Sequence, residues 1–158
     1  MKTKIREATI NDLEETTNLA IALMEEHEFI DYDYYKIVDN VREIWVPYVE
    51  DLLTSKSGKL FLLTDNRIRG YTLSVFQSRV PIYKKRDILY LGDIYVEPVY
   101  RGGPAMRLLR HTFDWALEQD VDFIEFQYNP RNNNVNRFVS RFFGSDKVYI
   151  REKKQIKR

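Results

Sequence analysis

The stretch from residue 88 to residue 119 constrains the fold more than any other part of the chain. Ile88 to Val96 is rich in the β-branched and aromatic residues that are typical of a strand. Arg101-Gly102-Gly103-Pro104 then has the composition of a turn. Beyond it, apolar or small residues recur at the spacing of an amphipathic helix to about Gln119, namely Ala105, Leu108, Leu109, Thr112, Phe113 and Ala116. A strand that leads through a glycine turn into such a helix predicts an α/β fold in which helices cover a sheet.

The rest of the chain extends this pattern on both sides. Thr9 followed by Asp12 resembles a helix-capping arrangement, so a first helix is expected from about Ile10 to His27. A second helix is expected over residues 37–48 and beyond, ending before Ser57-Gly58, with an interruption or kink near Pro47. Further strands are expected at residues 60–63, 71–76, 123–128 and 147–150, and a shorter helix at 134–143. The sequence therefore predicts one α/β domain over residues 1–158, a mixed sheet flanked by helices.

Composition excludes several classes of function. The chain has no cysteine, which rules out disulfides, thiol catalysis and cysteine-bound metal. Its two histidines, His27 and His111, are far apart and not grouped with acids at ligand spacing, so no metal is expected. A net charge of +1 and the lack of a long apolar run argue against nucleic acid and membrane as partners. We expect a cytoplasmic protein.

The turn at residues 101–106 has the chemistry of a phosphate-binding site. The first N–H groups of a helix lack intrahelical partners and lie at the positive end of the helix dipole, and glycine lets a phosphate approach the backbone. Arg101 and Arg107 could add charge-assisted contacts. An ordinary strand-to-helix loop would use the same glycines for backbone freedom alone. Neither a Walker loop nor the three-glycine dinucleotide motif is present.

This segment resembles the coenzyme A motif of the GNAT superfamily of N-acetyltransferases. The motif has the form Val-x-Pro-x-Tyr-Arg-Gly-x-Gly-x-Gly/Ala, and Val96, Pro98, Tyr100, Arg101 and Gly102 match it in order. Gly103-Pro104-Ala105 fits the remainder only if the loop is one residue shorter than usual. Pro104 also removes one potential N–H donor.

The resemblance implies a GNAT-like fold that binds acetyl-coenzyme A as cosubstrate and transfers the acetyl group to an amine. It implies that strand residues Ile94 and Val96 offer backbone groups to the pantetheine arm and that Asn133 contacts the same arm. The turn and helix start would hold the pyrophosphate through Arg101, Gly102, Gly103, Ala105, Met106 and Arg107. A homodimer is expected on the same ground.

Two residues are candidates for proton transfer. Asp93 lies on the strand before the turn, where related enzymes often place the base that deprotonates the amine, directly or through water; Glu125 and Glu97 are lesser candidates. Alternatively, Asp93 is a structural acid that bonds to backbone or to a basic side chain. The family's usual general acid, a tyrosine, falls on Ser140, whose hydroxyl is a weaker acid. Tyr128, Tyr149 or water could replace it.

An acceptor site is expected between the first two helices, in the region that GNAT folds commonly use. Acids and aromatics alternate there, and Asp31, Tyr32 and Asp33 are the candidate acceptor-binding residues. Carboxylates attract an ammonium group and aromatic faces add cation–π attraction. This predicts a cationic primary amine, on a small molecule or a peptide lysine, although a solvated connection would have the same composition.

Two other functions remain open at this stage. The missing tyrosine is compatible with a noncatalytic module that binds or senses acyl-coenzyme A. Asn132 to Asn134 together with the basic C-terminal residues would suit an RNA-binding protein, but no aromatic RNA-recognition motif accompanies them.

Overall fold

The structure is a computed structural model that describes residues 2–85, 87–129, 131–132 and 135. The chain divides into two compact units, residues 1–127 and 128–158. All elements described below belong to the first unit. Apart from Val135, the helix expected at 134–143 lies outside the described residues, as does the strand expected at 147–150, and a single domain over 1–158 stays a prediction.

The first unit begins with one strand and a group of helices, continues with three consecutive strands, and ends with a helix and a further strand. Its elements are β1 (Lys4–Glu7), η1 (Ile10–Asp12), α1 (Leu13–Ile30), α2 (Tyr32–Tyr35), α3 (Val41–Thr54), β2 (Gly58–Thr64), β3 (Ile68–Ser78), β4 (Asp87–Val96), η2 (Pro98–Tyr100), α4 (Gly103–Leu117) and β5 (Phe123–Phe126). The strands form one sheet in the order β1-β2-β3-β4-β5. The pairs from β1 to β4 are antiparallel and β4–β5 is parallel.

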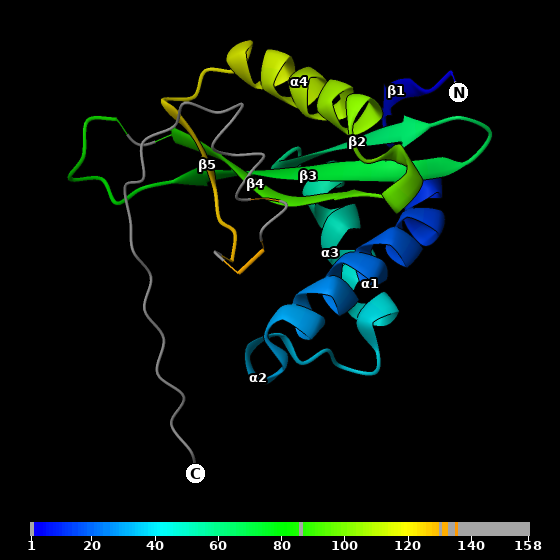
Figure 1. Cartoon of the computed structure of the whole chain (residues 1–158). Helices are drawn as coiled ribbons and strands as arrows, with labels where there is room; N and C mark the ends of the chain where they lie inside the picture. Colours follow the sequence, from blue (N-terminus) through cyan, green and yellow to red (C-terminus); the bar gives the residue numbers. More distant parts are fainter. Residues whose placement is uncertain (1, 86, 130, 133–134, 136–158) are drawn as a thin grey trace. The chain divides into compact units, whose positions relative to one another are not determined.

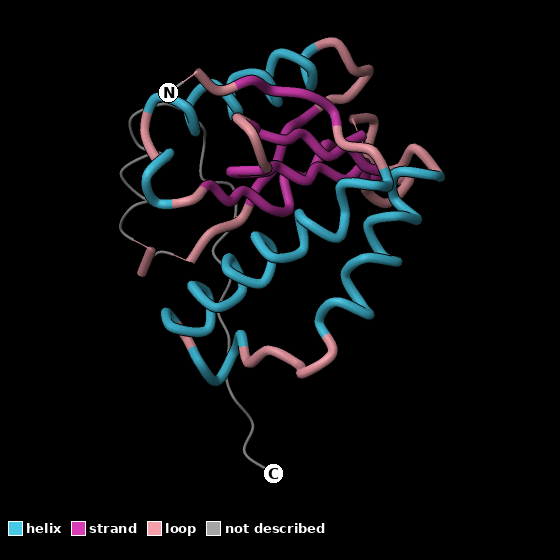
Figure 2. Tube along the Cα trace, turned by 90° about the vertical axis from the view of Figure 1, so that its right-hand side faces the viewer, coloured by secondary structure: helices cyan, strands magenta, loops and turns pink. Residues whose placement is uncertain are grey.

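Helices cover both faces of this sheet. Leu60 and Leu62 of β2 pack with residues of α1 and α3, whereas Phe61 and Leu63 pack with Leu108 of α4. This alternation follows from the two-residue period of a strand, which sends successive side chains to opposite faces. Figure 1 shows α4 on one side of the strands and α1 and α3 on the other, and Figure 2 shows the same layers from the side. The predicted mixed sheet flanked by helices is confirmed.

The predicted cap at the start of the first helical segment is present. Asp12 accepts hydrogen bonds from the backbone N–H and the hydroxyl of Thr9, at 2.8 and 2.9 Å, in a capping box. The Arg6 guanidinium binds both oxygens of the same carboxylate, at 2.8 and 2.6 Å. These bonds fix the connection from β1 to α1 and hold the pKa of Asp12 well below its usual range, with the Arg6 bond as the largest cause.

Asp12→Ala should therefore destabilise the fold at neutral pH. Removing a capping side chain costs about 1 to 2 kcal/mol in the free energy of unfolding. Because the folded-state pKa of Asp12 is lowered, its contribution is present above the unfolded-state pKa of about 4 and is lost as pH falls below it. Urea unfolding at pH 7 should separate variant from wild type, and the gap should shrink in acid. Glu25→Ala, at an exposed acid of α1, is the matched control; equal losses in the two variants would refute the capping role.

Two features of the helical layer differ from expectation. Pro47 does not end or divide the second helix, which runs from Val41 to Thr54. Its buried residues Val41, Trp45 and Val49 recur on both sides of the proline, so packing outweighs the lost N–H bond. The short helix α2 was not predicted, because a single turn leaves no periodic pattern to detect.

Candidate active site

Strand β4 has a free edge near its C-terminal end. It pairs with β5 from Ile88, opposite Phe123, to Leu91, opposite Phe126, although β4 itself continues to Val96. The pairing of β4 with β3 shifts register at the same place, so that Gly92 is an extra residue between Leu91 and Asp93. A bulge of this kind bends a strand and often redirects side chains beside a binding site. Among the described residues, no strand pairs with β4 beyond Leu91 on the β5 side.

The backbone groups of Ile94 and Val96 face this free edge. The N–H of Glu97 donates to the carbonyl of Arg69, so Glu97 turns its backbone groups toward β3. Successive residues of a strand point these groups to opposite sides. The backbone N–H and C=O groups of Ile94 and Val96 therefore point away from β3, toward the edge of β4 that β5 does not cover beyond Leu91. An extended ligand could add hydrogen bonds there in the manner of a further strand.

The N-terminus of α4 lies directly after this edge and is open. Gly102 has φ +117°, a left-handed conformation that favours glycine. Among the described residues, and apart from the adjoining backbone, no heavy atom lies within 4 Å of where a Cβ would stand at Gly102 or Gly103. The first turn closes through the N–H of Met106, which donates to the carbonyl of Gly102 at 2.9 Å. Within the described part of the chain, the N–H groups of Gly103 and Ala105 donate to no carbonyl or side chain. Pro104 has no N–H group. The helix start is thus a ready anion site.

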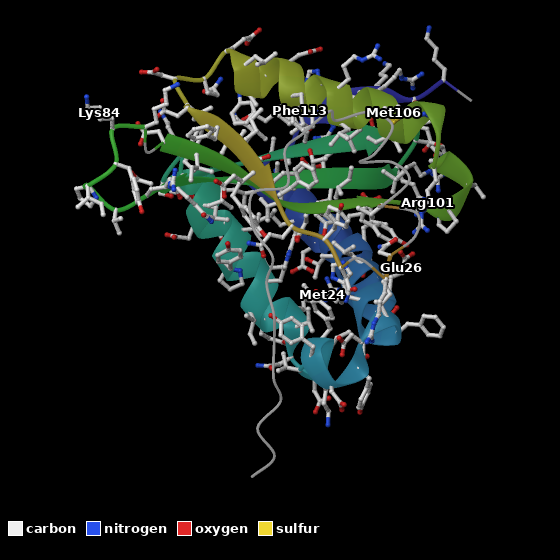
Figure 3. The ribbon with its side chains drawn as sticks, turned by 60° about the vertical axis from the view of Figure 1, so that its left-hand side comes forward. Met24, Glu26, Lys84, Arg101, Met106 and Phe113 are labelled. Carbon is white, nitrogen blue, oxygen red and sulfur yellow. The ribbon has the colours of Figure 1, made fainter. Side chains whose placement is uncertain are left out.

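The two arginines expected at the phosphates are held elsewhere in the structure. The Nε of Arg101 donates to the carbonyl of Val96 at 2.9 Å, and its guanidinium lies over the ring of Tyr95 and pairs with Glu26 of α1. Figure 3 shows Arg101 at the turn before α4, facing Glu26. Arg107 donates to the Thr3 hydroxyl. Their contact with a phosphate stays a prediction, and it requires that these bonds be exchanged.

Asp93 lies in the sheet face that α1 and α3 cover. It is half-buried and accepts a hydrogen bond from the Tyr71 hydroxyl at 3.3 Å. Burial raises the pKa of Asp93, and its polar neighbours Tyr71 and Trp45 oppose that shift because they favour the charged form. A carboxylate with a raised pKa is a better proton acceptor than an ordinary surface acid.

The partners of Asp93 were not predicted from the sequence. Trp45 is on α3 and Tyr71 is on β3, and their rings also contact each other edge to face, with centroids 6.1 Å apart. The expected helix and the expected strand contain these two residues, but nothing in the sequence indicates that they lie beside one acid. Glu97, a lesser candidate base, instead pairs with Arg67 and Arg69, at 2.8 and 3.2 Å.

The acidic segment between the first two helices is partly engaged in bonds of its own. Glu26 pairs with Arg101, and Glu28 accepts the N–H of Ile37 at 3.3 Å. Asp31 lies at the junction of α1 and α2, whereas Tyr32 and Asp33 are exposed on α2. The role of Asp31, Tyr32 and Asp33 in binding an acceptor stays a prediction.

Other residues predicted to take part in the site lie outside the described part of the chain. Ser140 and Asn133 are not among the described residues, and neither is Tyr149. Within the described part of the chain, no group of three or more His, Cys, Asp or Glu side chains could hold a metal ion. The same residues include no helix with both the length and the apolar character to cross a bilayer.

Comparison with known proteins rests on structure. Neither the protein-family models nor the curated proteins give a match to this sequence. Among solved structures, the BH1408 protein from Bacillus halodurans superimposes with a TM-score of 0.82 at 20% identity, covering 97% of this chain and 99% of that one. A possible acetyltransferase from Clostridium difficile 630 gives 0.73 at 17% identity, covering both chains fully.

A third similar structure is AAC(6')-Iy in complex with a bisubstrate analogue, CoA-S-monomethyl-acetylneamine. It gives a TM-score of 0.69 at 16% identity and covers 100% of this chain and 99% of that one. Such identities establish a shared fold. The GNAT-like fold that the resemblance implied is thereby confirmed for this chain.

Proposed function

We propose that this protein is an N-acetyltransferase that moves an acetyl group from acetyl-coenzyme A to a primary amine. One observation carries the proposal: the free edge of β4, at Ile94 and Val96, leads straight to the open N-terminus of α4. The first can bind an extended amide-containing arm and the second a pyrophosphate. Coenzyme A joins these two groups in one molecule, and a protein of the same fold binds a coenzyme A bisubstrate analogue.

The chemistry follows from the position of Asp93. A primary amine is an ammonium ion at neutral pH and must lose a proton before its lone pair can attack the thioester carbonyl, and Asp93 would accept that proton, directly or through water. The new C–N bond forms as the carbonyl oxygen takes up charge. The C–S bond then breaks, the nitrogen gives up its second proton, and the departing thiolate takes up one, so that the products are the amide and free coenzyme A. Backbone N–H groups at the free edge of β4 would stabilise the charged oxygen.

The proposal names the acceptor's reacting group, a primary amine, and not the molecule that carries it. The cationic preference predicted from sequence rested on the acids around α2, and Glu26 and Glu28 are engaged with Arg101 and the Ile37 N–H. One protein of this fold is seen in complex with a bisubstrate analogue that contains acetylneamine. A peptide amine is the alternative acceptor.

Calorimetric titration tests the cosubstrate half of the proposal. Acetyl-coenzyme A should bind with one site per chain, and coenzyme A lacking the acetyl group should compete. Pantetheine, which has the thiol arm of coenzyme A but no pyrophosphate, should bind far more weakly because it loses the contacts at α4. Equal affinity for coenzyme A and for pantetheine would show that the N-terminus of α4 does not bind the pyrophosphate.

The acidic segment gives a second, separable prediction about the acceptor. If Asp31 and Asp33 attract a cationic amine, Asp31→Asn with Asp33→Asn should raise its KM at low salt by roughly a few-fold and remove most of the salt dependence. Initial rates at two ionic strengths measure this. Undiminished activity of the double variant would leave the segment as a solvated connection.

A further inference from the structure

A groove lies between α1 and α3 on the same face of the sheet as Asp93. It has a volume of about 320 Å³ and is lined by Met24 and His27 of α1, Tyr35 of α2, Ile37 of the following connection, and Trp45 and Tyr48 of α3. Met24 extends from α1 on this side of the molecule (Figure 3). Small-molecule sites typically have this size and this dominance of apolar and aromatic side chains.

The charge of the groove differs from that of the acidic segment beside it. None of its lining residues is a carboxylate, and Lys36 is the lining residue with a full charge. Burial lowers the pKa of His27, so its ring is neutral at pH 7. Lys36 is exposed and lies over the ring of Tyr32, 5.8 Å from its centroid. The groove therefore suits an apolar group and disfavours a second ammonium.

Trp45 connects the groove to the candidate base. Its side chain lines the groove. The residue is only 5% exposed, and its ring packs against Tyr71, whose hydroxyl donates to Asp93. A ligand in the groove thus contacts a side chain that packs against the hydrogen-bond partner of the carboxylate.

We propose that this groove binds the apolar body of the acceptor, so that the preferred acceptors are primary amines with one aromatic or branched aliphatic group. This rests on the proposed acetyl transfer and names the substrate class for it. Apolar contact with Tyr48, which is half exposed, and with the part of Trp45 that lines the groove supplies the binding energy, which an acceptor with several charges cannot use. The preference for an acceptor with an apolar group over one with several charges should amount to about tenfold or more in kcat/KM.

The test compares phenylethylamine, butylamine and putrescine as acceptors. We expect kcat/KM to be highest for phenylethylamine, by about tenfold over putrescine. Tyr48→Ser, at a side chain that is 52% exposed and so dispensable for folding, should remove that advantage and leave acetyl-coenzyme A affinity unchanged. Tyr83→Ser, at an exposed tyrosine away from the groove, is the matched control. A preference for putrescine in the wild type, or no effect of Tyr48→Ser, would overturn the proposal.

A second measurement does not depend on turnover. In a Trp115→Phe background Trp45 is the remaining tryptophan, and its fluorescence reports directly on the groove. Phenylethylamine should change the emission saturably, putrescine should not, and Val38→Glu, which places a carboxylate among the lining residues, should allow putrescine to bind. If phenylethylamine gives no saturable change, the groove assignment fails even where acetyl-coenzyme A binds. If the change occurs without acetyl transfer, the groove holds and the proposed reaction fails.

Discussion

Gly103→Glu should weaken the binding of acetyl-coenzyme A by about 100-fold or more while the protein stays folded, because like charges brought together cost several kcal/mol. Gly103 is the first residue of α4, and the space where its side chain would begin is open. A glutamate there meets no neighbour and is favoured by the helix dipole. It places a negative charge where the pyrophosphate is proposed to lie.

Two control variants separate the causes of that loss. Gly103→Gln has nearly the same size without the charge, and should lose much less affinity than the glutamate. Gly103→Ala adds only a methyl group and should bind almost as the wild type does. Circular dichroism and thermal unfolding confirm the fold of each variant, and calorimetry gives the affinity. An unchanged affinity in folded Gly103→Glu would remove the start of α4 from the site.

Asp93→Asn should lower kcat by about 10²- to 10⁴-fold, the range typical of a lost general base. Asparagine can still accept the hydrogen bond from the Tyr71 hydroxyl, so the geometry and the affinity for acetyl-coenzyme A should be kept. In the wild type, kcat/KM should rise with pH along a limb set by the raised pKa of Asp93. That limb should be absent from the residual activity of the variant.

The same variant should be more stable than the wild type at pH 7. Because the folded-state pKa of Asp93 is raised, the wild type loses stability as pH rises from the unfolded-state value of about 4 through the folded-state pKa. Asparagine carries no such penalty, so the gap in unfolding free energy should close in acid. Asp114→Asn, at an exposed acid of α4, is the control. A less stable Asp93→Asn with normal turnover would make Asp93 a structural acid.

The elements that could be predicted from sequence are those whose signal is local. The capping box of Thr9 and Asp12, the turn at Gly102 and the periodic helix after it each depend on neighbouring residues. Element order then gave the layers of the fold. The interruption expected at Pro47 is wrong because a local rule ignores the packing that keeps α3 continuous.

The parts of the site that could not be predicted depend on contacts between distant residues. Asp93 was chosen for its place before the turn, but Trp45 and Tyr71 reach it only through the packing of α3 on the sheet. Likewise, Arg101 carries the expected charge, yet its partner Glu26 comes from α1. No spacing in the sequence indicates either contact, and the bulge at Gly92 is visible only in the strand register.

Mass-spectrometric detection of the N-acetylated amine, with free coenzyme A measured in the same reaction, tests the central claim most directly. With acetyl-coenzyme A and a panel of aromatic, aliphatic and polycationic amines, the account predicts acetylated product and free thiol in equal amounts, both strongly reduced in Gly103→Glu and Asp93→Asn. Tight binding of acetyl-coenzyme A with no acetylated product from any amine would contradict acetyl transfer and identify the protein as a noncatalytic acyl-coenzyme A binding module.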